Sequence, residues 1–294
     1  MITKHFLSGT GVAIVTPFLE NGELDIIALE KLVNHLVNGG VDYLVVLGTT
    51  GEAATLSKDE KKRVLQLVNN FNNNRVKLVA GIGGNHTAAV IESFNELDLS
   101  GYSAILSVSP YYNKPNAEGI FQHYKAISEA APLPVIIYNV PGRTGMNISV
   151  ANTIRIAREC KNIIATKEAS GNIEQIMQII SEKPDGFEVI SGDDGLTLPL
   201  IACGAIGVIS VVANAYPKQF SEMVKLCLEG KFSEARTIHE KMLPIINTLF
   251  VEGSPSGIKS FLSEMGIVKE SFRLPVVSVG AELKQKIIGL LTTV

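Results

Sequence analysis

Residues 163–180 read IIATKEASGNIEQIMQII, and this stretch contains one complete strand–helix unit. Its first half, residues 163–170, begins as a short apolar run of the kind that forms a buried parallel strand. From Ile173 to Ile180 the apolar residues instead recur at the 3.6-residue spacing of one helix face. Asn172 precedes that spacing, at the place where a helix would begin. The stretch therefore predicts a strand followed directly by a helix.

Strand-like runs of this type occur eight times along the chain, and amphipathic segments separate them. Most of the runs are apolar throughout, which is typical of parallel strands covered on both faces. Because parallel neighbours need a crossover helix, eight such units predict a (β/α)8 barrel, an α/β fold. The alternative is a doubly wound sheet, but residues 16–25 (TPFLENGELD) lack the G-x-G-x-x-G turn that this fold favours after its first strand. The expected strands are residues 11–18, 43–48, 77–83, 103–110, 134–141, 163–170, 188–194 and 207–214.

The alternation of strands and helices does not extend over the whole chain. After residue 230 the alternation stops, and residues 232–251, 256–265 and 281–291 are expected to be helices without further strands. We therefore expect a catalytic barrel in residues 1–230 and a C-terminal helical region in residues 231–294.

The ends of several helices are also marked in the sequence. The signals for the start and the end of a helix are an Asp25 cap with a Gly39–Gly40 stop, a Ser57–Glu60 capping box, and Pro217 in a first turn with Gly230 as the stop.

The composition of the 294 residues excludes several classes of protein. Hydrophobic residues make up 46% of the chain and charged residues 19%, so a large core can form and wholesale disorder is excluded. The formal net charge is −3, from 26 basic and 29 acidic residues, which gives no electrostatic case for binding nucleic acid or an anionic membrane.

Cysteine usage and the N-terminal residues favour the cytoplasm. Three scattered cysteines without a C-x-x-C spacing do not suggest a disulfide framework or a zinc ribbon. Residues 1–11 lack the apolar segment of a signal peptide. Residues 195–217 carry no charge, but Pro199, Gly204 and Gly207 interrupt them, and their second half is β-branched like a buried strand, so we do not expect a membrane span.

In a (β/α)8 barrel the active site lies at the carboxyl ends of the strands, and Lys167 is the reactive side chain that stands out there. An ammonium group inside an apolar strand is unfavourable unless it is paired or neutral, because burial lowers the pKa of lysine. A neutral lysine is a nucleophile that can form a Schiff base with a carbonyl substrate. An ion pair with a nearby carboxylate such as Asp193 is the equally supported alternative.

Other polar residues at the strand ends each have a functional and an ordinary interpretation. Tyr138 is placed to carry a proton, or it packs in the core with its hydroxyl satisfied. Thr49 and Thr50 lie between glycines that allow backbone N–H groups to approach a carboxylate, or they form an ordinary turn. Arg143, in a glycine-flanked loop, is either a solvated charge or a bidentate clamp for a substrate carboxylate.

Metal and nucleotide chemistry have little support in the sequence. The five histidines are isolated, with no pair at metal-ligand spacing. Asp193 and Asp194 lack an evident third carboxylate that would complete a divalent-cation site. The chain has neither a G-x-S-x-G elbow nor a Walker A loop.

The segments GTTGEAATLS, SPYYNKP, YNVPGRTG, TKEASGN, SGDDG and GVISVVAN occur in this order over nearly the whole chain. This ordered set resembles the dihydrodipicolinate synthase/N-acetylneuraminate lyase family of pyruvate-dependent aldolases. Two positions favour its synthase branch over the sugar-acid lyases, namely the pair Thr49-Thr50 and Arg143. The segment 253–257 (GSPSG) departs from the Asn-Pro-Ile-Pro-Val type of many synthases, and we expect this to affect assembly more than chemistry.

The resemblance implies a condensation of pyruvate with L-aspartate 4-semialdehyde that gives 4-hydroxy-tetrahydrodipicolinate, on the route to diaminopimelate and lysine. It implies that Lys167 forms the imine and that Thr50, Tyr138 and Tyr112 relay protons, with Tyr112 donated by a partner subunit. No metal or organic cofactor is implied, because the lysine imine serves as the electron sink. A homo-oligomer is implied, a tetramer built as a dimer of dimers. The substrate-binding residues would be Thr49, Thr50, Arg143, Gly192 and Ile209, with Thr49 and Thr50 on the pyruvate carboxylate and Arg143 on that of the semialdehyde.

The resemblance also bears on feedback inhibition by L-lysine. Relatives that lysine inhibits bind it near the segments that match residues 53–61, 85–89 and Tyr111, where they present a histidine and a glutamate. Here Lys58 and Ala89 occupy those two places, so we expect inhibition to be weak or absent.

Two other functions compete with this interpretation. A sugar-acid aldolase of the same family is the nearer one, and Arg143 argues against it because a polyol has no small terminal carboxylate for the guanidinium to hold. A non-catalytic binding protein that keeps the barrel is the other. A protein that had lost turnover would have no reason to keep all four residues of the implied reaction. The chain has all of them, namely Lys167, Tyr138, Tyr112 and Thr50.

Overall fold

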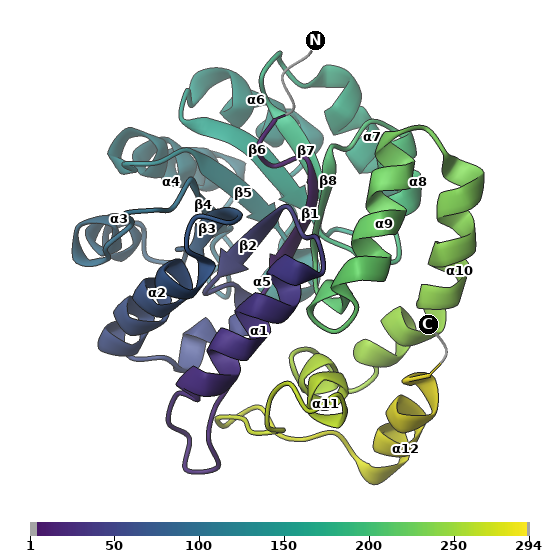
Figure 1. Ribbon diagram of the computed structural model, residues 1–294. Helices are drawn as coiled ribbons and strands as arrows, with labels where there is room; N and C mark the ends of the chain where they lie inside the picture. The colour runs from purple at the N-terminus through teal and green to yellow at the C-terminus, as the bar shows by residue number, and fades with distance from the viewer. Residues whose placement is uncertain (1–4, 293–294) are drawn as a thin grey trace.

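The computed structural model describes residues 5–292, and its centre is a closed barrel of eight parallel strands (Figure 1). Each strand pairs with the next one along the chain, and β8 pairs with β1 to close the barrel. The predicted fold is therefore confirmed. The strands are β1 (Gly9–Ala13), β2 (Tyr43–Val46), β3 (Lys77–Gly81), β4 (Ala104–Val108), β5 (Val135–Asn139), β6 (Ile163–Glu168), β7 (Glu188–Ser191) and β8 (Gly207–Ser210).

Helices follow the strands and cover the outside of the barrel, and their ends lie where the sequence signals place them. The Asp25 side chain accepts from Ala28 N at 3.0 Å, and Ser57 and Glu60 form the reciprocal capping box. The helices of the barrel are α1 (Ile26–Asn38), α2 (Lys58–Asn72), α3 (Thr87–Glu96), α4 (Ala117–Ala130), α5 (Pro141–Thr144), α6 (Val150–Glu159), α7 (Ile173–Glu182), α8 (Thr197–Ala202) and α9 (Pro217–Leu228). Three short 3₁₀ turns complete it, η1 (Thr49–Gly51), η2 (Ala53–Thr55) and η3 (Val212–Asn214).

The predicted strands were too long at their carboxyl ends, and the first one was also displaced. Residues 11–18 were expected, whereas β1 starts at Gly9 and ends at Ala13. The chain stays buried beyond the last ladder hydrogen bond, since Val15 and Phe18 are fully buried although they lie outside the strand. An apolar run records burial and not backbone pairing, so it could not locate the end of a strand.

The uncharged residues 195–217 do not form one element. They divide into α8, β8 and η3, so the prediction of a strand in their second half is confirmed. Within residues 5–292, no helix has the length and apolar character needed to cross a bilayer. Residues 1–4, part of the stretch in which we expected no signal peptide, lie outside the described residues.

Two apolar clusters separate the inside of the barrel from its outside. On β5, Ile136 and Tyr138 belong to the inner cluster, while Val135 and Ile137 pack against the helices. Because successive strand residues point to opposite faces, Lys167 shares the inward face of β6 with Ala165. The alternation of side chains therefore directs Tyr138 and Lys167 into the barrel.

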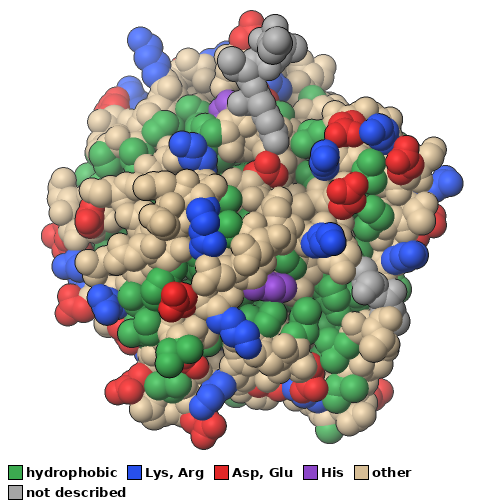
Figure 2. Space-filling model, viewed as in Figure 1, with side chains coloured by type: hydrophobic (Ala, Val, Ile, Leu, Met, Phe, Trp, Pro, Cys, Tyr) green, Lys and Arg blue, Asp and Glu red, His purple; other side chains and the backbone are tan. Residues whose placement is uncertain are grey.

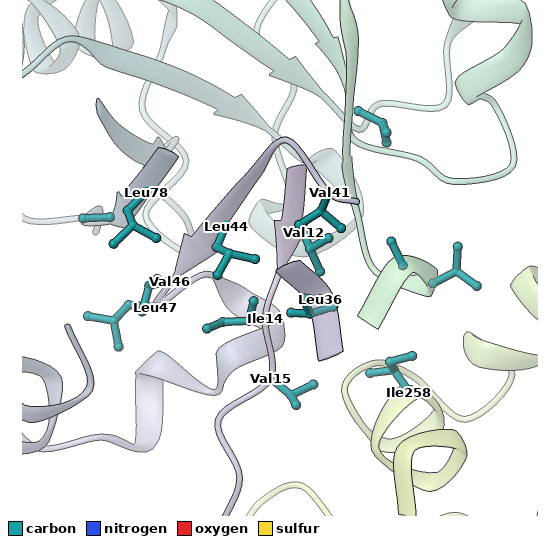
Figure 3. Packing of buried hydrophobic residues seen from close by; sticks show 14 of the residues in the cluster. Val12, Ile14, Val15, Leu36, Val41, Leu44, Val46, Leu47, Leu78 and Ile258 are labelled. Atoms are coloured by element: carbon teal, nitrogen blue, oxygen red, sulfur yellow. The ribbon is translucent and has the colours of Figure 1, made fainter. Parts of the chain in front are cut away.

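The C-terminal region consists of α10 (Phe232–Leu249), α11 (Ser256–Glu264) and α12 (Ala281–Leu290). These helices end one or two residues earlier than predicted. In Figure 1, α10 lies beside α9, and α11 and α12 lie below the barrel. Ile258 of α11 belongs to the same buried cluster as Val12 and Val15, as Figure 3 shows. On the face in Figure 2, acidic and basic side chains are interspersed over α9 and α10.

Candidate active site

Lys167 and Tyr138 form the centre of the candidate site. They are directly paired residues of β6 and β5, and both point into the barrel. The Lys167 Nζ atom lies 4.2 Å from the centroid of the Tyr138 ring. Burial lowers the pKa of Lys167 to about 8, although the negative charge of Asp194 acts in the opposite direction. Burial raises the pKa of Tyr138 above its usual value. The arrangement provides a lysine that loses its proton far more easily than one in water.

The structure tests the ion-pair interpretation of Lys167. In the described part of the chain Lys167 makes no ion pair, so the suggested pair with Asp193 is wrong. The nearby carboxylate is Asp194, which accepts hydrogen bonds from the backbone N–H groups of Val211 (3.1 Å) and Val212 (2.8 Å). Asp194 therefore holds the turn after β8 and influences Lys167 only through space. This geometry favours the nucleophile.

A cavity of about 510 Å³ opens at the carboxyl ends of the strands. Its volume lies within the range of pockets that take small metabolites. Tyr138 lines it, and Lys167 lies against Tyr138. The cavity extends past the carboxyl end of β4 toward α2 and α3, and other side chains that line it include Thr49, Lys61, Tyr111, Arg143 and Ser254.

The two threonines of the Gly48–Gly51 turn are placed differently. Thr49 is exposed and lines the cavity. Thr50 is buried and is not one of the lining residues. Thr16 Oγ1 donates to the carbonyl oxygen of Gly51 at 2.6 Å, which ties the turn to the segment after β1. A molecule in the cavity can therefore reach the Thr49 hydroxyl directly.

Arg143 lies at the mouth of the cavity, on the short helix α5 and not in a loop as expected. Its Nη2 atom donates to the carbonyl oxygen of Ser254 at 3.2 Å. Its positive charge lowers the pKa of both Lys167 and Tyr138, which places it within electrostatic range of them.

The contact with Ser254 adds to the expectation for residues 253–257. Ser254 and Pro255 line the cavity, so the segment also borders the site. The physical reason is that α10 and α11 bring their connecting loop back over the carboxyl ends of the strands.

The remaining predicted residues are spread around this centre. Tyr112 is 90% exposed, has a positive φ of 70° and does not line the cavity, so one chain alone does not bring it to Lys167. Ile209 is buried in the inner cluster with Tyr138. Gly192 N donates to the carbonyl oxygen of Glu168 at 2.6 Å, and a Cβ atom on Gly192 would lie 3.0 Å from Lys167 Cε. Any larger residue at position 192 would therefore press on the lysine.

The sequence did not indicate the buried hydrogen-bond network behind the site. Asn139 and Glu168 follow Tyr138 and Lys167 directly and point outward, and Asn139 Nδ2 donates to Glu168 Oε1 at 3.1 Å. Ser170 Oγ donates to Glu168 Oε2 at 3.0 Å. Burial raises the pKa of Glu168 to about 7. Two consecutive polar residues at the end of an apolar strand were the available signal, since only one of them can face into the barrel.

No group of three or more His, Cys, Asp and Glu side chains in residues 5–292 is arranged to hold a metal ion. Among those residues Cys160, Cys203 and Cys227 are all free thiols.

Comparison with known proteins assigns the family. The family model described as the dihydrodipicolinate synthetase family matches residues 6–294. The chain belongs to this family. A 4-hydroxy-tetrahydrodipicolinate synthase from Parabacteroides distasonis is 54% identical over 271 residues, which cover 92% of this chain and 91% of that protein.

Solved structures of family members have the same fold. The dihydrodipicolinate synthase from Thermotoga maritima superposes with a TM-score of 0.95 at 39% identity and covers 98% of both chains. The synthase from Cyanidioschyzon merolae, solved with lysine bound, has a TM-score of 0.94 at 37% identity and covers 99% of both chains. The family similarity therefore extends over the barrel and the C-terminal helices together.

Proposed function

We propose that this chain is a Schiff-base lyase that condenses pyruvate with L-aspartate 4-semialdehyde to 4-hydroxy-tetrahydrodipicolinate, in diaminopimelate and lysine biosynthesis. The observation that carries the proposal is the buried, unpaired Lys167 beside Tyr138, behind a cavity with Arg143 at its mouth. The curated relatives that bear the synthase name support this activity over the cleavage of sugar acids.

In the proposed reaction neutral Lys167 attacks the ketone carbon of pyruvate, and loss of water leaves an imine. Removal of a methyl proton gives an enamine, whose carbon attacks the aldehyde of the second substrate. The amino group of that substrate then adds to the imine carbon and displaces Lys167, which closes the ring. No metal or organic cofactor takes part, because the protonated imine accepts the electron pair.

The other residues bind the substrates or transfer protons in this proposal. Tyr138 and Thr50 carry protons between the reacting atoms and solvent, together with the partner subunit's Tyr112. Thr49 and Thr50 hold the pyruvate carboxylate, and Arg143 holds the carboxylate of the semialdehyde. Gly192 and Ile209 shape the space around Lys167. Support comes from the exposed Thr49 and Arg143 at the cavity and from the close packing of Gly192 on Lys167.

A direct assay tests the activity. The purified chain is given pyruvate and aspartate semialdehyde, and product formation is coupled to a reductase that consumes it. N-acetylneuraminate cleavage is measured beside it with the same preparation. We expect turnover in the first assay only. Cleavage of the sugar acid without condensation would reject the proposed substrates.

The active unit is proposed to be at least a dimer, within a homotetramer built as a dimer of dimers. Tyr112 is exposed in one chain and cannot reach its own Lys167, which supports a role in a partner's site. Mixing inactive Tyr112→Phe and Lys167→Ala chains should restore part of the activity, because a mixed dimer contains one site with both residues intact. Subunit exchange followed by the coupled assay measures this. A mixture that stays inactive, or a dilute monomer with full activity, contradicts the shared site.

Weak feedback by L-lysine is the next prediction. Ala89 lies exposed on α3 and itself offers no carboxylate to an ammonium group, and Lys58 is paired with Glu96 at 2.8 Å. Loss of one charged hydrogen bond costs ~1–3 kcal/mol, so we expect half-inhibition well above about 1 mM. Inhibition of the coupled assay by L-lysine measures it.

A gain-of-function variant sharpens the lysine test. Ala89→Glu should lower the half-inhibitory concentration, whereas Ala88→Glu, the adjacent exposed position, serves as the control for added charge. Half-inhibition of the unmodified chain below about 1 mM, which corresponds to ~4 kcal/mol of binding, contradicts the expectation.

The proposal also includes the location of the enzyme in the cell and the division of the chain into two regions. We place the enzyme in the cytoplasm, with the three free thiols as support. The division into a barrel of residues 1–230 and a helical region of residues 231–294 rests on the absence of strands after residue 230 among the described residues.

A further inference from the structure

A buried ion pair lies directly behind the threonine turn of the site. Glu52 follows Thr49–Gly51 and has a left-handed backbone, with φ 53°. Its carboxylate pairs with the ammonium group of Lys259 on α11, and the side chains are 2% and 0% exposed. The pair thus joins the strand end that carries Thr49 to a helix 207 residues later in the chain.

Glu52 borders the cavity, but the pair is almost completely buried and both charged groups have further partners. Lys259 Nζ donates to the carbonyl oxygen of Ser271 at 3.0 Å, and Arg273 N donates to Glu52 Oε2 at 3.5 Å. The rings of Phe18 and Phe272 lie 4.4 Å and 5.0 Å from the ammonium nitrogen. All of these partners come from the segment after β1 or from the C-terminal region.

Stability alone does not explain such a pair. Removing two charges from water is costly, and well-packed apolar residues of similar volume often stabilise a fold as much or more. A buried pair does impose one specific geometry, because each charge tolerates only its partner. Glu52 also has a backbone conformation that non-glycine residues seldom adopt, at the end of the turn that carries the threonines. The clearest structural consequence of the pair is therefore the position of the turn.

We propose that the Glu52–Lys259 pair is a positioning device through which the C-terminal helix α11 sets the place of the Thr49 and Thr50 hydroxyls relative to Lys167. The inference rests on the proposed function, in which this turn binds the pyruvate carboxylate. The C-terminal region then has a specific part in the first half of the reaction. It contacts the site a second time through the Ser254 carbonyl on Arg143.

Neutral variants of the full-length chain test the proposal. Glu52→Gln keeps the size of the side chain and an acceptor for Arg273 N. Glu52→Gln combined with Lys259→Met leaves no uncompensated charge, so it protects against loss of folding. In both variants we expect the pyruvate concentration for half-maximal borohydride trapping to rise about ten- to a hundredfold, because displacements of about 1 Å have effects of this size. KM for the semialdehyde at saturating pyruvate should change little.

Two controls separate positioning from stability and from the proposed chemistry. Glu188→Gln makes the same change in the Lys183–Glu188 pair (3.1 Å) at the start of β7, and it should leave pyruvate trapping unchanged. Thr49→Val, which replaces the hydroxyl with a methyl group of similar size, should reproduce the pyruvate defect. Normal pyruvate dependence in a folded Glu52→Gln chain or in the double variant overturns the proposal, as does an equal loss for both substrates. If the unmodified chain itself traps no pyruvate, the proposed function fails instead.

Discussion

Lys167→Ala should lower kcat by about three or more orders of magnitude, because it removes the covalent route and leaves only binding and positioning. In the unmodified chain, pyruvate and borohydride should add a stable mass to the peptide that contains Lys167 and inactivate the enzyme. Peptide mapping by mass spectrometry after trapping measures both effects. The variant should keep its melting temperature within a few degrees, since Lys167 makes no ion pair in the described part of the chain.

Lys259 is an internal control for this result. Burial lowers its pKa, as it does for Lys167, although the charge of Glu52 acts in the opposite direction. Lys259 is, however, paired with Glu52, whereas Lys167 has no ion pair in the described part of the chain and lies against Tyr138, which lines the cavity. We therefore expect label on Lys167 only. Label on Lys259 or on a surface lysine would falsify the assignment of the nucleophile.

The rate at which borohydride traps the pyruvate imine should increase with pH. Lys167 is reactive when it is neutral, and its pKa of about 8 lies below the ordinary lysine value of 10.5. The rate of imine formation should accordingly rise with pH through about 8 and then level off. A lysine with its ordinary pKa would continue to gain reactivity beyond pH 10. Trapping rates measured between about pH 6 and 10 distinguish the two cases.

The barrel was predictable because its signal is repeated. Each of the eight units combines a buried apolar run with an amphipathic helix, and parallel strands connected by helices have few possible topologies. The strand ends were not predictable to the residue. Val15 and Phe18 are as deeply buried as Val12, yet only Val12 pairs with the strands of the barrel, and Phe18 forms a separate bridge with Leu24. At the carboxyl ends of the strands, residues therefore remain buried after the backbone pairing of the barrel has ended.

The placement of Lys167 and Tyr138 was predictable, whereas the contacts that support them were not. Lys167 and Tyr138 are the next-to-last residues of neighbouring strands, and the alternation of side chains along a strand directs both into the barrel. Asp193 and Asp194 lie in an irregular turn, where no period indicates which one faces the lysine. Lys259 did carry a signal, because Leu262, three residues later, lies on the same side of a helix. Its partner Glu52 could be found only once the fold had brought α11 to the threonine turn.

Arg143→Ala should damage the use of the semialdehyde far more than the formation of the pyruvate imine. In the proposed reaction the guanidinium holds the carboxylate of the second substrate, and losing a charge-assisted contact of this type costs ~2–3 kcal/mol. This corresponds to a fall of about 30- to 150-fold in kcat/KM for the semialdehyde. Steady-state kinetics with each substrate varied in turn measure the effect, and borohydride trapping follows the imine separately.

Arg143→Lys and Arg236→Ala are the matched variants. Lysine keeps the charge but not the planar fork, so it should restore only part of the lost kcat/KM. Arg236, exposed on α10 beside Glu240 at 3.7 Å, should tolerate alanine without a change in either half of the reaction. An equal loss for both substrates in Arg143→Ala would show that the residue serves the loop at Ser254 rather than the substrate.

The charge of Arg143 also affects the pKa of Lys167, and the same variants test this effect independently. Its positive charge lowers the pKa of Lys167, so removing it should move the inflection of imine formation to higher pH. Arg143→Lys should leave that inflection near its original position, because a positive charge remains at the mouth of the cavity. The pH shift therefore follows the charge, while recognition of the semialdehyde follows the shape of the guanidinium. If the lysine variant recovered full semialdehyde kinetics together with the original inflection, charge alone would account for Arg143, and the bidentate clamp would be the wrong description.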